Sequence, residues 1–246
     1  VQNGLSYNIE LVIQDVEGNT TRVKIPVEGK NLPITNKRKQ KTTDYHILAN
    51  RPNSFDLGRS KVYFPENTFY ENFYADLKDK GDTIKLHNNT VAAHKNFTLT
   101  FDVAHHTEEA RKQMFIARLS KYGNPLYTKT RKRNTTFSTR TRNLGTYILA
   151  KDSVPPSIRP KNFKARQWLN NYRYLSLRIT DDLSGIREYN ATLNGKWILM
   201  EYEPKTNTIT YNFDDKIANE TQCELKVTVT DNVGNTKTFE TTFFRK

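Results

Sequence analysis

One short turn constrains the fold of this chain more than any other feature of its sequence. Residues 231–236 read Asp-Asn-Val-Gly-Asn-Thr and separate two runs, 225–229 and 239–243, in which apolar and polar residues alternate. Alternation with a period of two gives a strand one buried and one solvated face. In the turn, Asp can accept hydrogen bonds from its own backbone, Gly supplies positive φ, and Asn tolerates the left-handed region. The pattern therefore predicts an antiparallel hairpin.

The same turn occurs near the other end of the chain. Residues 15–20 read Asp-Val-Glu-Gly-Asn-Thr and lie between alternating runs at 7–13 and 23–27. Two copies of one hairpin indicate at least two related β-modules. The 13 Tyr and 13 Phe suit the cores of β-sandwiches, because aromatic side chains favour strands. The predicted fold class is all-β, with tandem immunoglobulin-like or β-sandwich modules, the first represented only by its terminal hairpin.

The last two modules are separated by a clear boundary. Pro155-Pro156 forces extended backbone and removes two hydrogen-bond donors, which favours a stiff joint between domains. Residues 153–246 then show turn signals every 8–12 residues, including the hairpin signal Asn194-Gly195. This spacing is typical of an immunoglobulin-like sandwich of about seven strands.

The earlier part of the chain divides into three stretches. Residues 61–152 predict a middle β-sandwich with one short helix that Thr107 caps. Residues 30–60 predict a basic connecting segment, since basic residues outnumber acids there and apolar residues are few. Residues 1–29 predict the last hairpin of a partial immunoglobulin-like module, because two strands cannot bury a core alone. We therefore expect the chain to begin partway through a longer protein. The basic residues of the connecting segment are Lys30, Lys37, Arg38, Lys39, Lys41, Arg51, Arg59 and, at its edge, Lys61.

Charge suggests a binding surface. The chain carries a formal net charge of +13, which favours anionic partners such as acidic glycans or lipopolysaccharide. No acidic residue lies between Lys121 and Lys151, so a hairpin there would present a positive face. Phe137 is the one aromatic residue inside the basic cluster, which argues against stacking on nucleic-acid bases. A solvated face is the alternative reading. The candidate patch for an anionic partner consists of Lys129, Arg131, Lys132, Arg133, Arg140 and Arg142.

The histidines argue against a metal site. His105 and His106 are adjacent, and on a strand they would point to opposite faces, so they could not share an ion. The other three histidines form no His-x-His or His-x-x-x-Asp pair. We expect no metal or cofactor in this chain. The five histidines are His46, His87, His94, His105 and His106.

The remaining candidate residues can be explained by structural roles. The aspartates in the turns at 181–182 and 231 could help to hold calcium, but turn capping explains them without an ion. No nucleophile elbow or phosphate loop occurs, so no catalytic residue is expected. The single Cys223 is expected to be a small buried hydrophobe, and Trp168 and Trp197 are expected to fill the core.

The stretches 64–74, 94–98, 143–147 and 181–186 together resemble one known family. They are similar to the C-terminal, non-catalytic region of lysostaphin/LytM-like zinc metallopeptidases of the Bacteroidetes cell envelope. The zinc of that family is held by His-x-x-x-Asp and His-x-His, which are absent here, so the resemblance places any such zinc in an upstream domain. It implies a secreted parent in the periplasm or at the outer membrane that acts on the peptide crosslinks of peptidoglycan, or a relative that has kept the fold as a scaffold.

Three hypotheses for function remain. The first is a non-catalytic scaffold that positions an upstream domain of the same protein or docks it onto other envelope proteins. The second is a module that binds carbohydrate or lipopolysaccharide through the basic hairpin. An active hydrolase is the third, and it would require residues outside this chain. The sequence contains no run of about 18–20 apolar residues, which is the length that a transmembrane helix requires.

Overall fold

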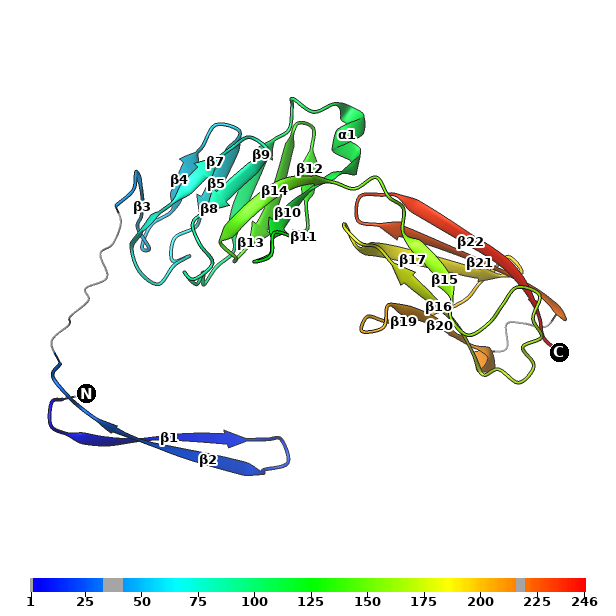
Figure 1. The fold of residues 1–246 in the computed structure, drawn as a ribbon, viewed down its shortest axis with the longest axis horizontal. Helices are drawn as coiled ribbons and strands as arrows, with labels where there is room; N and C mark the ends of the chain where they lie inside the picture. Colours follow the sequence, from blue (N-terminus) through cyan, green and yellow to red (C-terminus); the bar gives the residue numbers. More distant parts are fainter. Residues whose placement is uncertain (1, 33–41, 216–219) are drawn as a thin grey trace. The chain divides into compact units, whose positions relative to one another are not determined.

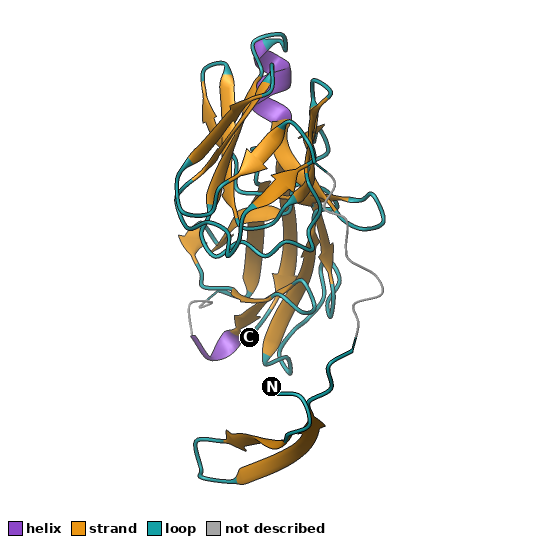
Figure 2. Ribbon diagram, turned by 90° about the vertical axis from the view of Figure 1, so that its left-hand side faces the viewer, coloured by secondary structure: helices purple, strands orange, loops and turns teal. Residues whose placement is uncertain are grey.

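The structure, a computed structural model, describes residues 2–32, 42–215 and 220–246 and divides the chain into two units, Val1–Lys41 and Thr42–Lys246. Antiparallel strands dominate both units, as Figures 1 and 2 show, so the predicted all-β class is confirmed. Within these described ranges, every helix is too short or too polar to cross a membrane.

The first unit contains the predicted N-terminal hairpin. Strand β1 (Ser6–Gln14) pairs in an antiparallel register with β2 (Thr20–Glu28). In its turn, the Asp15 carboxylate accepts hydrogen bonds from the amide nitrogens of Glu17 and Asn19. Apolar residues face one another across the two strands and remain exposed within the unit, so this ribbon has an apolar face that it cannot bury itself. The cross-strand apolar pairs are Tyr7–Val27, Ile9–Ile25 and Leu11–Val23.

The C-terminal module has the strand order of an immunoglobulin-like sandwich. One sheet runs β15-β16-β20-β19 and the other runs β18-β17-β21-β22. With the eight strands lettered A, B, C, C′, D, E, F and G in chain order, these sheets are A-B-E-D and C′-C-F-G. A shared core lies between them and includes Leu177, Val227 and Phe243. The strands are β15 (Ser157–Pro160), β16 (Tyr174–Thr180), β17 (Ile186–Leu193), β18 (Lys196–Trp197), β19 (Glu201–Glu203), β20 (Thr208–Asn212), β21 (Gln222–Asp231) and β22 (Thr236–Phe244).

The middle module is a second sandwich. Its sheets run β11-β10-β14-β8-β7 and β12-β13-β9-β5-β4, and a small third sheet pairs β3 with β6. Inward-facing residues such as Phe64, Leu99 and Tyr147 form its core. The strands are β3 (Tyr45–Ile47), β4 (Asn53–Asp56), β5 (Ser60–Phe64), β6 (Phe73–Ala75), β7 (Leu77–Asp79), β8 (Thr83–Leu86), β9 (Phe97–Asp102), β10 (Met114–Leu119), β11 (Pro125–Tyr127), β12 (Arg131–Arg133), β13 (Thr136–Thr141) and β14 (Gly145–Lys151).

The middle module begins earlier than residue 61, so the predicted boundary at 60 is wrong. Strand β4 pairs with β5, and β3 pairs with β6 while it buries Ile47 completely. The polar composition of this stretch concealed two short strands that are stabilised by the sheet they join. The described remainder of the predicted basic segment is 30–32 and 42–44. Lys37, Arg38, Lys39 and Lys41 lie outside the described residues.

The predicted helix and cysteine are confirmed. The helix α1 spans Glu108–Gln113, and the Thr107 hydroxyl accepts a hydrogen bond from the amide of Ala110 at 3.3 Å. Cys223 is fully buried in the C-terminal core, and this burial raises the pKa of its thiol.

The predicted burial of the two tryptophans is wrong. Trp168 is 54% exposed and packs on Phe244, while Trp197 is 61% exposed. Trp197 lies opposite Thr192, on the outer face of its sheet, so the next residue, Ile198, enters the core instead. The stretch 197–202 is therefore not one strand, because the chain passes from β18 in one sheet to β19 in the other.

Candidate functional site

The junction between the middle and C-terminal modules is marked by strand β10. Met114 and Ile116 point into the middle core, as alternation predicts. Phe115 and Ala117, on the opposite face of the same strand, are also buried, so this strand has two buried faces. The second face is covered in part by Leu183 and Val233, which come from turns of the C-terminal module. The two sandwiches therefore share a small apolar cluster.

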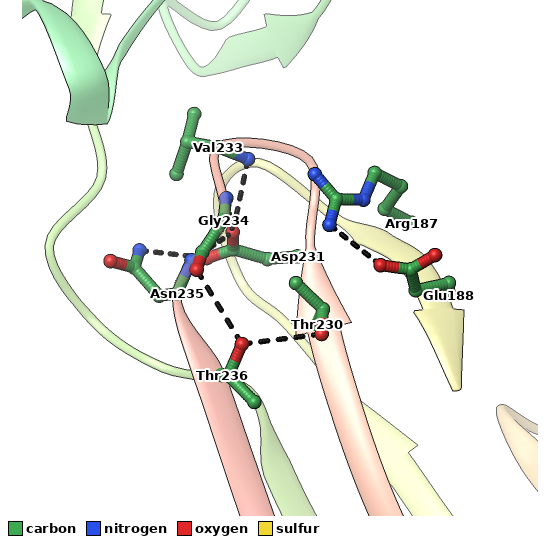
Figure 3. Close-up of polar contacts among 8 residues, drawn as sticks. All are labelled: Arg187, Glu188, Thr230, Asp231, Val233, Gly234, Asn235 and Thr236. Atoms are coloured by element: carbon green, nitrogen blue, oxygen red, sulfur yellow. Dashed lines mark hydrogen bonds and ion pairs between the residues drawn. The ribbon is translucent and has the colours of Figure 1, made fainter. Parts of the chain in front are cut away.

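The turn that carries Val233 is the predicted hairpin turn at residues 231–236, between β21 and β22. The Asp231 side chain is 0% exposed, and its Oδ1 accepts hydrogen bonds from the amides of Val233, Gly234 and Asn235 at 3.0, 2.7 and 2.8 Å. Its Oδ2 accepts a fourth, from Asn235 Nδ2 at 2.8 Å (Figure 3). Four donors on one carboxylate fix the turn and thus the position of Val233 at the junction.

Asp152 is the last residue before the linker, and it connects the two modules through one hydrogen bond to the middle module and two to the C-terminal module. Its amide donates to the carbonyl of Gln113 in the middle module. Its carboxylate Oδ2 accepts from the amide of Ser184, and its carbonyl accepts from Asn235 Nδ2, both in the C-terminal module. The residue is 2% exposed. A stiff joint was predicted from Pro155-Pro156; contacts of Asp152 and the apolar cluster hold the modules together beside it.

Three carboxylates meet at this junction. Oxygen atoms of Asp152, Asp181 and Asp231 lie within 4.8 Å of one another, whereas Asp182 is exposed and outside this group. Burial, and to a lesser degree the two neighbouring carboxylates, raise the pKa of Asp181. Each of the three accepts backbone amide hydrogen bonds, including those from Leu183 and Gly185 to Asp181. Backbone amides thus account for all three carboxylates. Turn capping was predicted for Asp181 and Asp231, but no role was predicted for Asp152.

The predicted basic patch is divided by the structure. Arg131 and Arg133 of β12 pair with Ser138 and Thr136 of β13, on the face away from the buried Phe137. Arg140 lies on this same outer face, two residues beyond Ser138. We call Arg131, Arg133 and Arg140 the basic face. Lys129 is exposed but precedes the strand, and Arg142 follows β13 and donates from Nε to Asn96.

Lys132 points to the other side of β12 and has a structural role. Its ammonium group donates hydrogen bonds to the carbonyls of Arg111 and Lys112, at 3.2 and 2.6 Å, in the last turn of α1. It also lies 5.4 Å from the ring centroid of Phe137. Carbonyls at a helix C-terminus lack partners within the helix and attract cations. Lys132 is exposed as a residue, but desolvation of its ammonium group beside the helix lowers its pKa.

Acidic side chains share the outer sheet face with the arginines. Asp102 of β9 is directly opposite Thr136, so it lies beside the basic face, and its Oδ1 accepts from the amide of Ala104. Lys61 of β5 is paired with Asp56 at 2.8 Å. No acidic residue is close to the basic cluster in the sequence, but acidic residues of neighbouring strands lie close to it in the folded sheet. The net positive charge of the face comes from the three arginines.

The prediction that His105 and His106 point to opposite faces of a strand is wrong. Strand β9 ends at Asp102, and both histidines lie in the turn between β9 and α1. There both rings face one carboxylate, that of Asp82, with His105 Nε2 at 3.0 Å from one oxygen and His106 Nε2 at 2.9 Å from the other. Adjacent side chains point to opposite faces only on a strand, and these two histidines lie in a turn.

Comparison with known families finds a match for one part of the chain. A family model for Zu5-like domains matches residues 44–152, which is the middle sandwich from just before β3 to the end of β14. This match agrees with the earlier start of the middle module. No curated protein matches the chain.

Proposed function

We propose that this chain is a non-catalytic interaction region of a cell-envelope protein related to the LytM-like peptidases. It would position an upstream domain, or dock it into a peptidoglycan or outer-membrane complex, in the periplasm or at the outer membrane. The resemblance in four stretches of the sequence supports this assignment to a family and compartment.

The observation that carries the positioning role is the junction. Phe115, on the outer face of β10, is 1% exposed, and it shares a cluster with Leu183 and Val233 from the neighbouring module. Together with the three hydrogen bonds of Asp152, this cluster couples two sandwiches that would otherwise move independently about a linker. A coupled pair of sandwiches defines a fixed spacing, which is what a positioning element requires.

Two experiments test the proposal. Purified peptidoglycan incubated with this chain and Zn²⁺ should release no fragments above the buffer control, and zinc-dependent release would refute the non-catalytic role. In the full-length parent, deletion of residues 42–246 should release the protein from the envelope fraction that retains the intact form. Unchanged retention after the deletion would refute docking.

A second candidate function rests on the basic face. Arg131, Arg133 and Arg140 project from adjacent strands and are all exposed, so they can meet an anionic glycan or the phosphates of lipopolysaccharide. Binding of this kind would weaken with salt, because exposed charges are screened. Lys129 and Arg142 flank the face and Lys132 is excluded from it, since its ammonium is held by the helix.

A matched pair of triple variants tests this candidate. Replacement of Arg131, Arg133 and Arg140 by Ala should abolish salt-sensitive binding to lipopolysaccharide or acidic glycans. The control replaces Arg159, Arg178 and Lys205, three exposed cations of the C-terminal module, and removes the same charge. Equal losses in both variants would mean that net charge alone governs binding, and unchanged binding in the first would leave the basic face as a solvated surface.

A further inference from the structure

We propose that Asp82, His105 and His106 form a binding site for a divalent transition-metal ion of the zinc type. The three side chains come from two turns of the middle sandwich, and their ligand atoms all lie within 4.8 Å of one another. The inference is independent of the proposed function, because it concerns an ion that ties two turns together and needs no partner.

The arrangement of the ligand atoms supports one shared ion. Each imidazole faces a different oxygen of Asp82, at 3.0 Å for His105 and 2.9 Å for His106, and the ring centroids lie 4.0 Å apart. Among the described residues, His106 Nε2 is buried and makes no hydrogen bond, although it lies 2.9 Å from an oxygen of Asp82, within ion-pair distance. Buried polar atoms are normally satisfied, and a metal ion would satisfy this nitrogen.

Both turns are fixed by backbone hydrogen bonds. Asp82 follows β7 in a turn closed by the amide of Lys80 and the carbonyl of Thr83, and its own carbonyl accepts from the amide of Leu149. The amide of His106 donates to the carbonyl of Val103, and Thr107 begins α1 directly afterwards. Little backbone entropy therefore remains to be lost on binding, which favours a preformed site.

The donor set selects the kind of ion. Two imidazole nitrogens and a carboxylate oxygen are typical of zinc with three protein ligands and one open position, whereas calcium and magnesium prefer oxygen ligands alone. Zinc bonds of about 2.0–2.2 Å place tetrahedral ligand atoms about 3.3 Å apart. The two nitrogen–oxygen distances, 3.0 and 2.9 Å, therefore need to lengthen by only a few tenths of an ångström. The side chains are 41%, 30% and 21% exposed for Asp82, His105 and His106, which leaves a path for the ion and a fourth position for water.

The bound ion would join the β7–β8 turn to the turn between β9 and α1. These two turns are more than twenty residues apart in the sequence, and β7 and β9 belong to different sheets. A metal bridge would therefore connect the two sheets of the middle sandwich at one end. Because an ion that binds the folded state stabilises it, zinc should raise the unfolding temperature of the chain.

The test is titration of the full chain with Zn²⁺ at neutral pH, followed by calorimetry and by the unfolding temperature. Wild type should bind one ion per chain with a rise in unfolding temperature, and Co²⁺ should give visible absorption bands of a four-coordinate site. Replacement of both His105 and His106 by Ala should abolish binding and the thermal shift. The matched control replaces His46 and His94, two exposed histidines elsewhere in the same module, and should bind as wild type does.

Absence of stoichiometric binding by wild type would overturn the proposal, and so would equal losses in the double variant and its histidine-matched control. Folding of the variants is checked by their unfolding without metal. Independently of any variant, Zn²⁺ should shift the ring resonances of His105 and His106 in the wild-type spectrum and leave those of His46 unchanged. Shifts spread over all histidines would contradict a defined site.

Discussion

Replacement of Asp231 by Ala should destabilise the C-terminal module strongly, although only one small side chain changes. The carboxylate is 0% exposed and accepts three backbone amides and the side chain of Asn235. Hydrogen bonds to a charged group contribute about 1.5–3 kcal/mol each. Gly234 is exposed, so its amide regains water in the variant, while the amides of Val233 and Asn235 are partly shielded. We expect a loss of about 3–5 kcal/mol in the free energy of unfolding.

Urea unfolding measured by tryptophan fluorescence suits this prediction, since Trp168 and Trp197 both lie in the C-terminal module. With a denaturant slope of about 2 kcal/mol per molar urea, the midpoint should fall by about 2 M. Replacement of Asp231 by Asn keeps an acceptor oxygen and removes one of three clustered charges, so it should cost clearly less. A loss below about 1 kcal/mol for the Ala variant would refute the reasoning. A loss as large in the Asn variant would show that the charge, rather than the satisfied amides, matters.

Three further predictions follow from the contacts of single residues. Phe115→Ala removes a buried ring from the junction and should lower the free energy of unfolding by about 3–4 kcal/mol, measured by calorimetry, whereas a cost below about 1 kcal/mol would contradict its burial. Lys132→Met keeps the aliphatic stem but leaves the α1 carbonyls uncapped, so it should cost about 0.5–1 kcal/mol, and a neutral result would contradict the capping role. Burial lowers the pKa of His87 from its usual 6.5, and its Nδ1 accepts from the amide of Asp76. His87 therefore binds a proton more tightly in the unfolded chain than in the folded one. Its contribution to the free energy of unfolding is fully present above pH 6.5 and is lost as the pH falls below that value. The His87→Gln variant should lack this loss in melting curves recorded at a series of pH values, and a pH profile identical to that of wild type would disprove it.

Local signals in the sequence predict much of the fold because they act locally in the structure as well. The turns at 15–20 and 231–236 have the predicted Asp-centred hydrogen bonds, and Asn194 and Gly195 adopt positive φ of 49° and 76° in a hairpin. The alternation in β9 and β21 corresponds to an alternation of buried and exposed side chains. Each of these features depends on a few neighbouring residues.

Features that depend on register or on the partner of a strand could not be predicted in the same way. Trp197 is exposed because it pairs with Thr192 on the outer face, and hydrophobicity alone does not reveal which face a residue takes. Strand β3 is short, and the sequence around it is polar, so its formation depends on its pairing with β6. Strand β9 ends at Asp102 and a turn follows, so His105 and His106 are not on a strand and can face the same carboxylate.

One signal for the junction was present in the sequence. Residues 114–117 read Met-Phe-Ile-Ala and residues 147–150 read Tyr-Ile-Leu-Ala, two unbroken apolar runs in a module where strands such as β9 alternate. Such a run indicates a strand buried on both faces, and the second face needs a cover from outside its own sandwich. Asp152 had no comparable signal, because its role depends on Ser184 and Asn235, which are distant in the sequence.

The central claim is that the middle and C-terminal sandwiches are held together at their junction and form one coupled spacer. Residual dipolar couplings of backbone amides, measured for residues 44–152 and 153–246 in one aligned sample, test this claim most directly. The account predicts that a single alignment tensor fits both sets. Two sets that require different tensors would show independent motion and would contradict it.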